Sequence, residues 1–326
     1  MSFINFFKKS SSKPLSLTED SISQLFVKIA VPSSVGTVFM TLYNVVDTYF
    51  AGKISAEALA ALAQTFPVYF IIIAIGVGLS IGTTSLIANA IGEKKKEKAS
   101  YFLAQSISLA IFTSIIVSIL GINIGPYIIL AMNDSVTTML LSMDYLNIIF
   151  LGSIFVFIQM AVNSSLSALG DTKSNRNVLI FSFFLNIILN PILISGNFFN
   201  ISIFPALGIK GIALATILSQ LIGLIYLLYK ISKTEIYIYF KKNFLIPKFV
   251  FLREILFQGI PASIGLMMIA LGSYIILYFV SIFGNNAIAG FSSAGRYEQL
   301  LFLPLLGLST AVTSIVGQNL GAKKPE

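Results

Sequence analysis

The sequence predicts an all-α membrane protein with several transmembrane helices, and three observations support this fold class. Of its 326 residues, 56% are hydrophobic and only 10% are charged, with a mean hydropathy of +0.90. Soluble domains carry about 25% charged residues, so this composition argues against a water-soluble globule. Long apolar runs recur along the chain without the alternating pattern of a membrane barrel. Part of the chain also repeats itself 229 residues later.

The apolar runs define the expected helices in order. Residues 1–25 are polar and predict a cytoplasmic N-terminal tail rather than a cleavable signal peptide. Eight runs follow, at about 26–50, 58–91, 100–121, 137–168, 177–195, 208–231, 255–283 and 286–319. A membrane span needs about 20 apolar residues, so we expect eight transmembrane helices. The longer ones must tilt or extend beyond the hydrocarbon.

Basic residues indicate the orientation of these helices. If both chain ends are cytoplasmic, 18 of the 21 Lys and Arg residues fall on the cytoplasmic side. Only Lys53 and Lys210 fall outside, and Arg296 falls within a helix. This bias is typical of inner-membrane proteins and explains the net charge of +8 without a nucleic-acid partner. We expect a multi-pass protein of the plasma (inner) membrane, with its lysines near anionic lipid headgroups.

The internal repeat predicts the domain organisation. Residues 32–97 align without gaps to 261–326, and the identical positions include Pro and Gly residues and a Lys-Lys pair. Six helices precede the second copy, so the two repeats should have the same orientation in the membrane. We expect an N-terminal six-helix lobe at 26–231, a cytoplasmic connector at 232–254, and the first two helices of a second lobe at 255–326. Two full repeats would need about 458 residues, so we also expect about four helices and about 130 residues to be missing.

The composition excludes most catalytic chemistry. The chain has no Cys, His or Trp, which removes disulfides, His/Cys metal sites, and thiol or imidazole nucleophiles. An intramembrane enzyme would need such a nucleophile, paired aspartates or metal ligands. We therefore do not expect an enzyme.

Helix one contains the first candidate site. Asp47 is the only carboxylate near the middle of a span in the first lobe, and Asn44 and Tyr43 lie three and four residues before it. These spacings can bring polar groups to one side of a helix. Burial disfavours an uncompensated charge, so Asp47 should take up a proton or hold a cation. A structural, hydrogen-bonded Asp47 is the alternative.

Helices five and six add polar groups that could complete this site. Asn186 and Asn190 are four residues apart, and Pro191 removes a bond from the helix beside them. Thr216 and Gln220 have the same spacing on helix six. Together with Asp47 they could form an oxygen cage for a monovalent cation, or they could serve as packing hydrogen bonds between helices. In helix eight, Arg296 and Glu298 are expected to line a water-filled cavity rather than face lipid.

The chain resembles the multidrug and toxic compound extrusion (MATE) transporters, most closely their bacterial and archaeal multidrug branches. The resemblance covers residues 20–326 and rests on these stretches: LYNVVDTYFAG, ALAALAQTFP, GLSIGTTSLIANAIG, ALGDTK, NIILNP, GIALAT, GRYEQLLFLP and VGQNLGA. It implies two six-helix lobes around a V-shaped cavity, of which helices one to eight are present here. It also implies alternating access and export of amphipathic, often cationic, compounds in exchange for Na⁺ or H⁺.

The resemblance also implies roles for particular residues. Asp47 matches the coupling aspartate of the first lobe, and Asn186, Asn190 and Thr216 match the other members of its cation site. Asn190 departs from the family pattern, which prefers Asp there. The resemblance therefore leaves the coupling ion open between H⁺ and a Na⁺ held at these four residues. Asn44 is expected to assist coupling, and Tyr43, Gln220, Arg296 and Glu298 to line the substrate cavity.

We expect small-molecule substrates, lipid contacts, a monomer, and no cofactor besides the coupling ion. The nearest alternative is a flippase for lipid-linked oligosaccharides, which shares this architecture. Its phosphate-bearing substrate would favour several arginines in the cavity, whereas only Arg296 lies in a predicted span.

Overall fold

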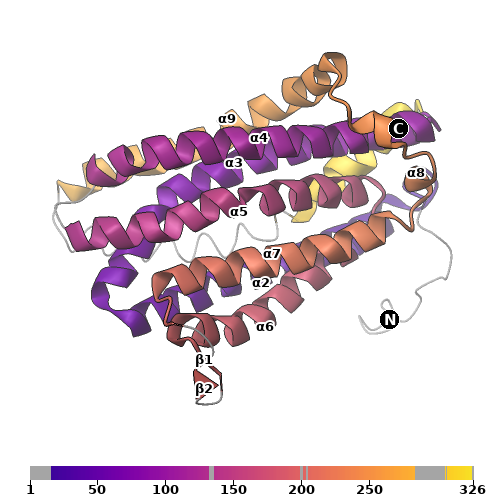
Figure 1. Ribbon diagram of the computed structural model, residues 1–326. Coiled ribbons are helices and arrows are strands. Elements are labelled where there is room, and N and C mark those ends of the chain that lie inside the picture. The colour runs from indigo at the N-terminus through magenta and orange to yellow at the C-terminus, as the bar shows by residue number, and fades with distance from the viewer. Residues whose placement is uncertain are drawn as a thin grey trace, which may run out of the picture.

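A computed structural model describes residues 16–131, 136–198, 201–202, 205–282, 305 and 307–324 as a bundle of long helices (Figure 1). Within these residues, seven helices are long and apolar enough to cross a membrane. They are α2 (Ile22–Ile54), α3 (Ala56–Gly92), α4 (Lys96–Ala131), α5 (Val136–Ala168), α6 (Lys173–Ser195), α7 (Ile209–Ile231) and α9 (Phe249–Ser281). The predicted all-α membrane class is confirmed.

The helix boundaries differ from the apolar runs at a few places. The helix α2 begins at Ile22, four residues before its run, and α9 begins at Phe249, inside the expected connector. The connector contains a short helix α8 (Glu235–Ile238) and a 3-10 turn η1 (Lys242–Leu245). A small hairpin, β1 (Asn197–Phe198) with β2 (Ile201–Ser202), joins α6 to α7. Of the eighth run, residues 307–321 are helical, and Arg296 and Glu298 lie outside the described residues.

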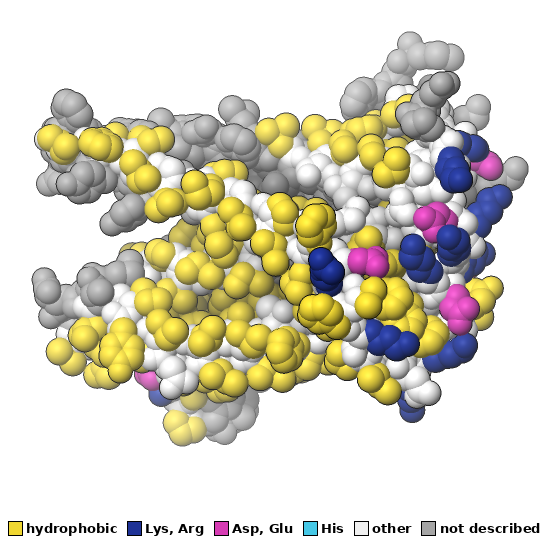
Figure 2. Space-filling view, turned by 90° about the horizontal axis from the view of Figure 1, so that it is seen from above, with side chains coloured by type: hydrophobic (Ala, Val, Ile, Leu, Met, Phe, Trp, Pro, Cys, Tyr) yellow, Lys and Arg dark blue, Asp and Glu magenta, His cyan; other side chains and the backbone are white. Residues whose placement is uncertain are grey.

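The helix α5 lies at the centre of the first lobe and packs against α3, α4 and α7. Phe150 and Phe157 of α5 are almost fully buried in one apolar cluster, and Leu166, nearer its end, is buried in a second. Apolar side chains also cover much of the described surface seen in Figure 2, as lipid contact requires. Charged side chains gather at one end instead, and we call this the lysine end (Figure 2).

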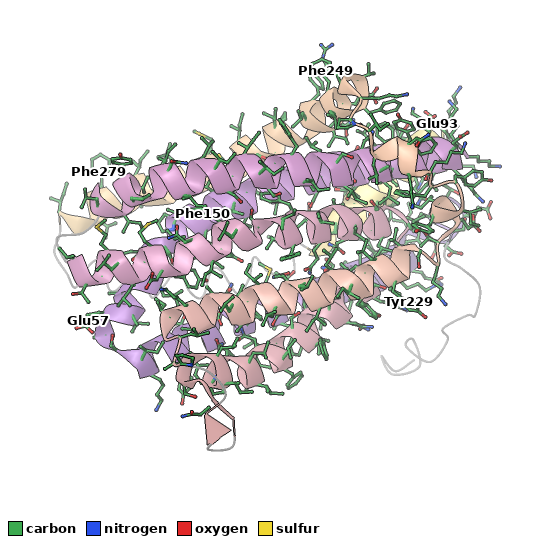
Figure 3. All side chains as sticks on the ribbon, viewed as in Figure 1. Glu57, Glu93, Phe150, Tyr229, Phe249 and Phe279 are labelled. Carbon is green, nitrogen blue, oxygen red and sulfur yellow. The ribbon has the colours of Figure 1, made fainter. Side chains whose placement is uncertain are left out.

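Glu93 and Tyr229 lie toward the lysine end, whereas Glu57 and Phe279 lie toward the opposite end (Figure 3). The start and the end of α3 therefore lie at opposite ends of the bundle, and α7 ends at the lysine end whereas α9 ends opposite to it.

The repeat is visible in the hydrogen bonds that end two helices. After α3, the N–H of Lys94 donates to the Ile91 carbonyl at 2.9 Å, and Lys94 has a φ of 61°. After the helix at 307–321, the N–H of Lys323 donates to the Leu320 carbonyl at 3.1 Å, and Lys323 has a φ of 56°. Few residues other than glycine adopt this left-handed conformation, so its recurrence 229 residues later marks equivalent structure.

The two repeats touch near the lysine end. Gly78 of α3 lies against Ser263 of α9, and Gly307 lies against Ser34 of α2. Gly307 and Ser263 are the counterparts of Gly78 and Ser34 in the second repeat, so the same contact forms twice with the two repeats exchanged. Hydrogen bonds add to this contact: the Ser314 hydroxyl donates to the Ser167 carbonyl at 2.8 Å, and the Gln318 amide donates to the Ala168 carbonyl at 2.6 Å.

Toward the other end, the described parts of the two repeats separate. A Cβ added at Gly265 or Gly272 of α9 would meet no described atom within 4 Å. Met268 and Phe279 on the same helix are 59% exposed. The described surface is hollowed between two arms at this end (Figure 2). As far as the described residues extend, the bundle is therefore closed at the lysine end and open opposite to it.

Candidate functional site

The carboxylate of Asp47 is the centre of a buried hydrogen-bond cluster. Asn186 and Asn190 each donate an Nδ2–H to Asp47 Oδ1 at 3.0 Å. The Thr216 hydroxyl donates to Asp47 Oδ2 at 3.2 Å. Three helices therefore converge on one side chain, namely α2 with Asp47, α6 with the two asparagines, and α7 with Thr216.

Local helix geometry explains why these groups meet. Asn186 and Asn190 are four residues apart, so both project from one face of α6, which packs against both α2 and α7. The helix continues through Pro191 to Ser195. Pro191 therefore neither breaks the helix nor displaces Asn190 from the carboxylate.

The cluster compensates a charge that would otherwise be costly. Asp47 is 5% exposed and is the only buried charged side chain within the described residues, while Asn186 and Asn190 are fully buried. Charge-assisted hydrogen bonds from three donors stabilise the ionised carboxylate in this apolar setting. Asn190 also donates to Asn186 Oδ1 at 3.0 Å, which fixes the orientation of both amides.

The geometry differs from the expected oxygen cage. Both amides present N–H groups to Asp47, and the Asn186 oxygen already accepts a hydrogen bond. Asn190 Oδ1 is buried and has no hydrogen-bond partner among the described residues. As arranged, the cluster is therefore a set of donors around an anion. A cation held there would require both amides to turn their oxygens inward.

The other predicted residues are placed differently. Tyr43 is buried beside the hydroxyls of Thr216 and Ser219. Gln220 is half-buried on α7, and it is not among the three residues that donate hydrogen bonds to Asp47. Asn44 does not join Tyr43 and Asp47 on the buried side of α2 and is exposed instead. Its carbonyl accepts the hydroxyl of Thr48 at 2.9 Å within the same helix.

The separation of Asn44 has a simple cause. The buried stripe of α2 follows a four-residue spacing through Tyr43, Asp47 and Ala51. Asn44 lies on the flank of that stripe, where a narrow contact with neighbouring helices does not reach.

Three further residues near Asp47 did not emerge from the sequence. Tyr69 of α3 and Tyr145 of α5 lie close enough to interact electrostatically with Asp47, and Ser219 lies beside Tyr43. The spacing of Ser219, three residues after Thr216 on α7, could have indicated it. No comparable signal marks the two tyrosines, because their proximity depends on how α3 and α5 pack against α2.

Comparisons with known proteins agree with this architecture. The MatE family model matches residues 32–192 and 261–326, and these two matches begin 229 positions apart, the offset of the repeat. The probable multidrug resistance protein NorM of Thermotoga maritima is 31% identical over 311 residues, covering 94% of this chain and 65% of that protein. The FAD transporter of Shewanella oneidensis is 27% identical over 315 residues, covering 94% and 67%. The chain thus spans about two thirds of the length of these relatives.

A solved structure gives the same result. A MOP superfamily transporter from Pyrococcus furiosus, whose binding pocket of reverse polarity suggests a different function, matches with a TM-score of 0.85 and 27% identity. The match covers 97% of this chain and 69% of that one.

Proposed function

This chain belongs to the MatE family, whose members are transporters rather than enzymes, and on that premise we propose that the protein is a secondary active multidrug exporter. It exports amphipathic, cationic organic compounds and takes up an ion in exchange. The observation that carries this proposal is the buried Asp47 cluster. Within the described residues it is the one place where a charge inside the membrane can be gained or lost.

The orientation of the amides favours H⁺ over Na⁺ as the coupling ion. A proton can bind at Asp47 Oδ2 once the Thr216 hydroxyl turns from donor to acceptor, which is a rotation about one bond. Sodium requires oxygen ligands, so the buried amides of Asn186 and Asn190 would both have to reorient. Asn190 also supplies no negative charge of its own.

Protonation would act on the position of α2. It removes the charge that receives the hydrogen bonds from α6 and α7, and so weakens the attachment of α2 to those helices. At its lysine end, the same helix packs through Leu25 and Ile29 against Ala311 and Ile315 of the second repeat. A shift of α2 would therefore reach the contact between the repeats. Export follows if the proton and the drug each bind the two conformations with different affinity.

We place the lysine end in the cytoplasm of a cell with this protein in its plasma membrane, following the positive-inside bias. The open end then faces outward, and the described arrangement corresponds to an outward-facing state. The protein acts as a monomer in this proposal. A flippase for lipid-linked oligosaccharides receives no support, because within the described residues no Lys or Arg side chain is buried where it could bind a phosphate inside the bundle.

The test is export of a cationic dye from proteoliposomes with separately imposed H⁺ and Na⁺ gradients, using full-length protein. Asp47→Asn should abolish gradient-driven export because its amide cannot exchange a proton. Asp144→Asn is the matched control, since Asp144 lies nearer the start of α5 and pairs with Lys210 at 3.2 Å. Undiminished export by Asp47→Asn would remove Asp47 from the mechanism. Export driven by Na⁺ alone would overturn the proton assignment.

A further inference from the structure

A cavity of about 610 Å³ lies at the lysine end, outside the Asp47 cluster. Its basic wall is the turn between α3 and α4, with Lys94, Lys95, Lys96 and Lys98. The helix α4 begins at Lys96, so the unpaired N–H groups of its first turn add partial positive charge to this wall.

The lysines are only partly neutralised by acidic neighbours. Glu93 lies 2.9 Å from Lys95 and 3.7 Å from Lys98, and Lys96 is paired with Glu235 of the connector. Glu97, which also lines the cavity, is paired with Lys241 of the connector at 3.2 Å. Lys94 has no ion-pair partner within the described residues and is exposed. The cavity therefore keeps an uncompensated positive charge that an anion can neutralise.

Aromatic side chains form another part of the cavity lining, which we call the aromatic wall; they are Tyr101, Tyr239, Phe244 and Phe251. The ring of Tyr101 contacts those of Phe244 and Phe251, with centroid distances of 4.5 and 4.4 Å. The buried Gln105 holds the connector in place: its amide N–H groups donate to two connector carbonyls at 2.5 and 2.8 Å. Its oxygen accepts the N–H of Lys248 at 2.8 Å. These three hydrogen bonds hold the connector side of the cavity against α4.

We propose that this cavity binds the phosphate-bearing headgroup of an anionic phospholipid from the cytoplasmic leaflet. Lysines and N–H groups at a helix start match a phosphate, and the aromatic wall matches the apolar part below it. Free phosphate would match the lysines and N–H groups but has no apolar part to match the aromatic wall. A lipid is favoured because apolar side chains next to the lining residues are exposed, in α8 and at the start of the membrane helix α9. They are Ile238 at 79%, Phe249 at 77% and Val250 at 64%.

Such a lipid would link parts that are distant in sequence. The cavity is lined by the α3–α4 turn, by Tyr239 and Phe244 of the connector, and by Phe251 at the start of α9. The second repeat begins with α9, so a bound headgroup joins the first lobe to the segment that leads into the second. This site is independent of the Asp47 mechanism, and either proposal can fail alone.

The repeat supplies a matched control for testing this proposal. Lys94→Gln/Lys95→Gln removes two charges from the cavity wall. Lys323→Gln/Lys324→Gln removes the equivalent charges 229 positions later, and neither of these lysines lines the cavity. Binding of phosphatidylglycerol to the full-length protein is measured by native mass spectrometry and by thermal stabilisation in detergent. Phosphatidylcholine with the same acyl chains and glycerol 1-phosphate serve as comparison ligands.

We expect the Lys94/Lys95 variant to bind phosphatidylglycerol about tenfold more weakly and the Lys323/Lys324 variant to bind it like the wild type. Equal weakening in both variants would show general charge attraction and overturn the site, as would no weakening in either. Stabilisation by glycerol 1-phosphate as strong as that by phosphatidylglycerol would overturn the lipid assignment. Each variant should unfold cooperatively without lipid, which shows that it folds, and the Lys94/Lys95 variant should unfold slightly below the wild type because it loses the Lys95–Glu93 pair.

Discussion

Ala88 packs against Gly317, the residue that occupies the same place in the repeat 229 positions later. A residue that touches its own repeat counterpart lies on the axis that relates the two repeats. A Cβ added at Gly317 would lie 2.8 Å from the Ala88 Cβ, so the backbones at this axis approach as closely as small residues permit.

The contact beside this axis predicts the effect of a single methyl group. In Gly78→Ala the added Cβ would meet the Ser263 side chain and the Gly259 carbonyl, the latter at 2.6 Å. We expect the variant to lose about 1–3 kcal/mol of stability, because helices in contact cannot absorb this overlap. Thermal unfolding of the purified full-length protein measures it. Gly265→Ala, where the Cβ meets no described atom, is the control, and an equal loss there would contradict the explanation.

For gradient-driven export, the hydroxyl group of Thr216 should matter more than the shape of its side chain. Thr216→Val keeps the volume of the side chain and removes the donor to Asp47 Oδ2, whereas Thr216→Ser keeps the donor. A hydrogen bond to a charged group contributes about 1.5–3 kcal/mol, so we expect gradient-driven export to fall about tenfold or more in the Val variant alone. Initial rates of dye export measure this effect.

Thr48→Val is the control for that series, since Thr48 is exposed on α2 and bonds only its own helix in the described structure. Wild-type export by Thr216→Val would show that the hydroxyl does not take part in coupling.

Gln105 should be important for holding the connector. Gln105→Met fills a similar volume but removes three hydrogen bonds to the connector backbone and leaves partly buried connector groups without these partners. We expect a loss on the order of 2–3 kcal/mol, measured as a lower unfolding temperature. Gln258→Met, at an exposed position of α9, should leave the temperature unchanged. Equal unfolding temperatures for wild type and Gln105→Met would show that the connector does not need these bonds.

The ionic contacts of Glu93 predict that the stability of the folded protein depends on pH. The hydrogen bond from Lys95, together with the charge of Lys98, lowers the pKa of Glu93 below its usual 4.5. A carboxyl group with a lowered pKa stabilises the folded state above its usual pKa, and this contribution is lost as the pH falls through the folded-state value. Glu93→Gln should therefore unfold slightly below the wild type at pH 7, and the difference should vanish in acid.

Thermal scans between pH 7 and pH 3 measure this difference, which should also shrink in high salt because Glu93 lies at the surface. Glu254→Gln, at an exposed position of α9, is the control variant. A difference between Glu93→Gln and wild type that persists unchanged across the pH range would contradict the assignment.

The sequence by itself determined the class, the helix positions, the charge bias and the repeat. Each depends on properties that are local or that recur at a fixed offset: apolar length, the distribution of lysines, and the match between Lys94 and Lys323. It also marked Asp47, because a carboxylate in an apolar run is costly wherever the helices pack. Together with the family resemblance, it grouped Asp47 with the residues on helices five and six.

The tertiary structure alone decided how these residues face one another. It turned both amides to donate to Asp47, left Asn44 outside the cluster, and brought Tyr69 and Tyr145 close to it. The physical reason is that the rotation and crossing of each helix are set by packing between segments more than a hundred residues apart in the chain. Spacing within one helix says which side chains share a face, and only the packed bundle says what that face meets.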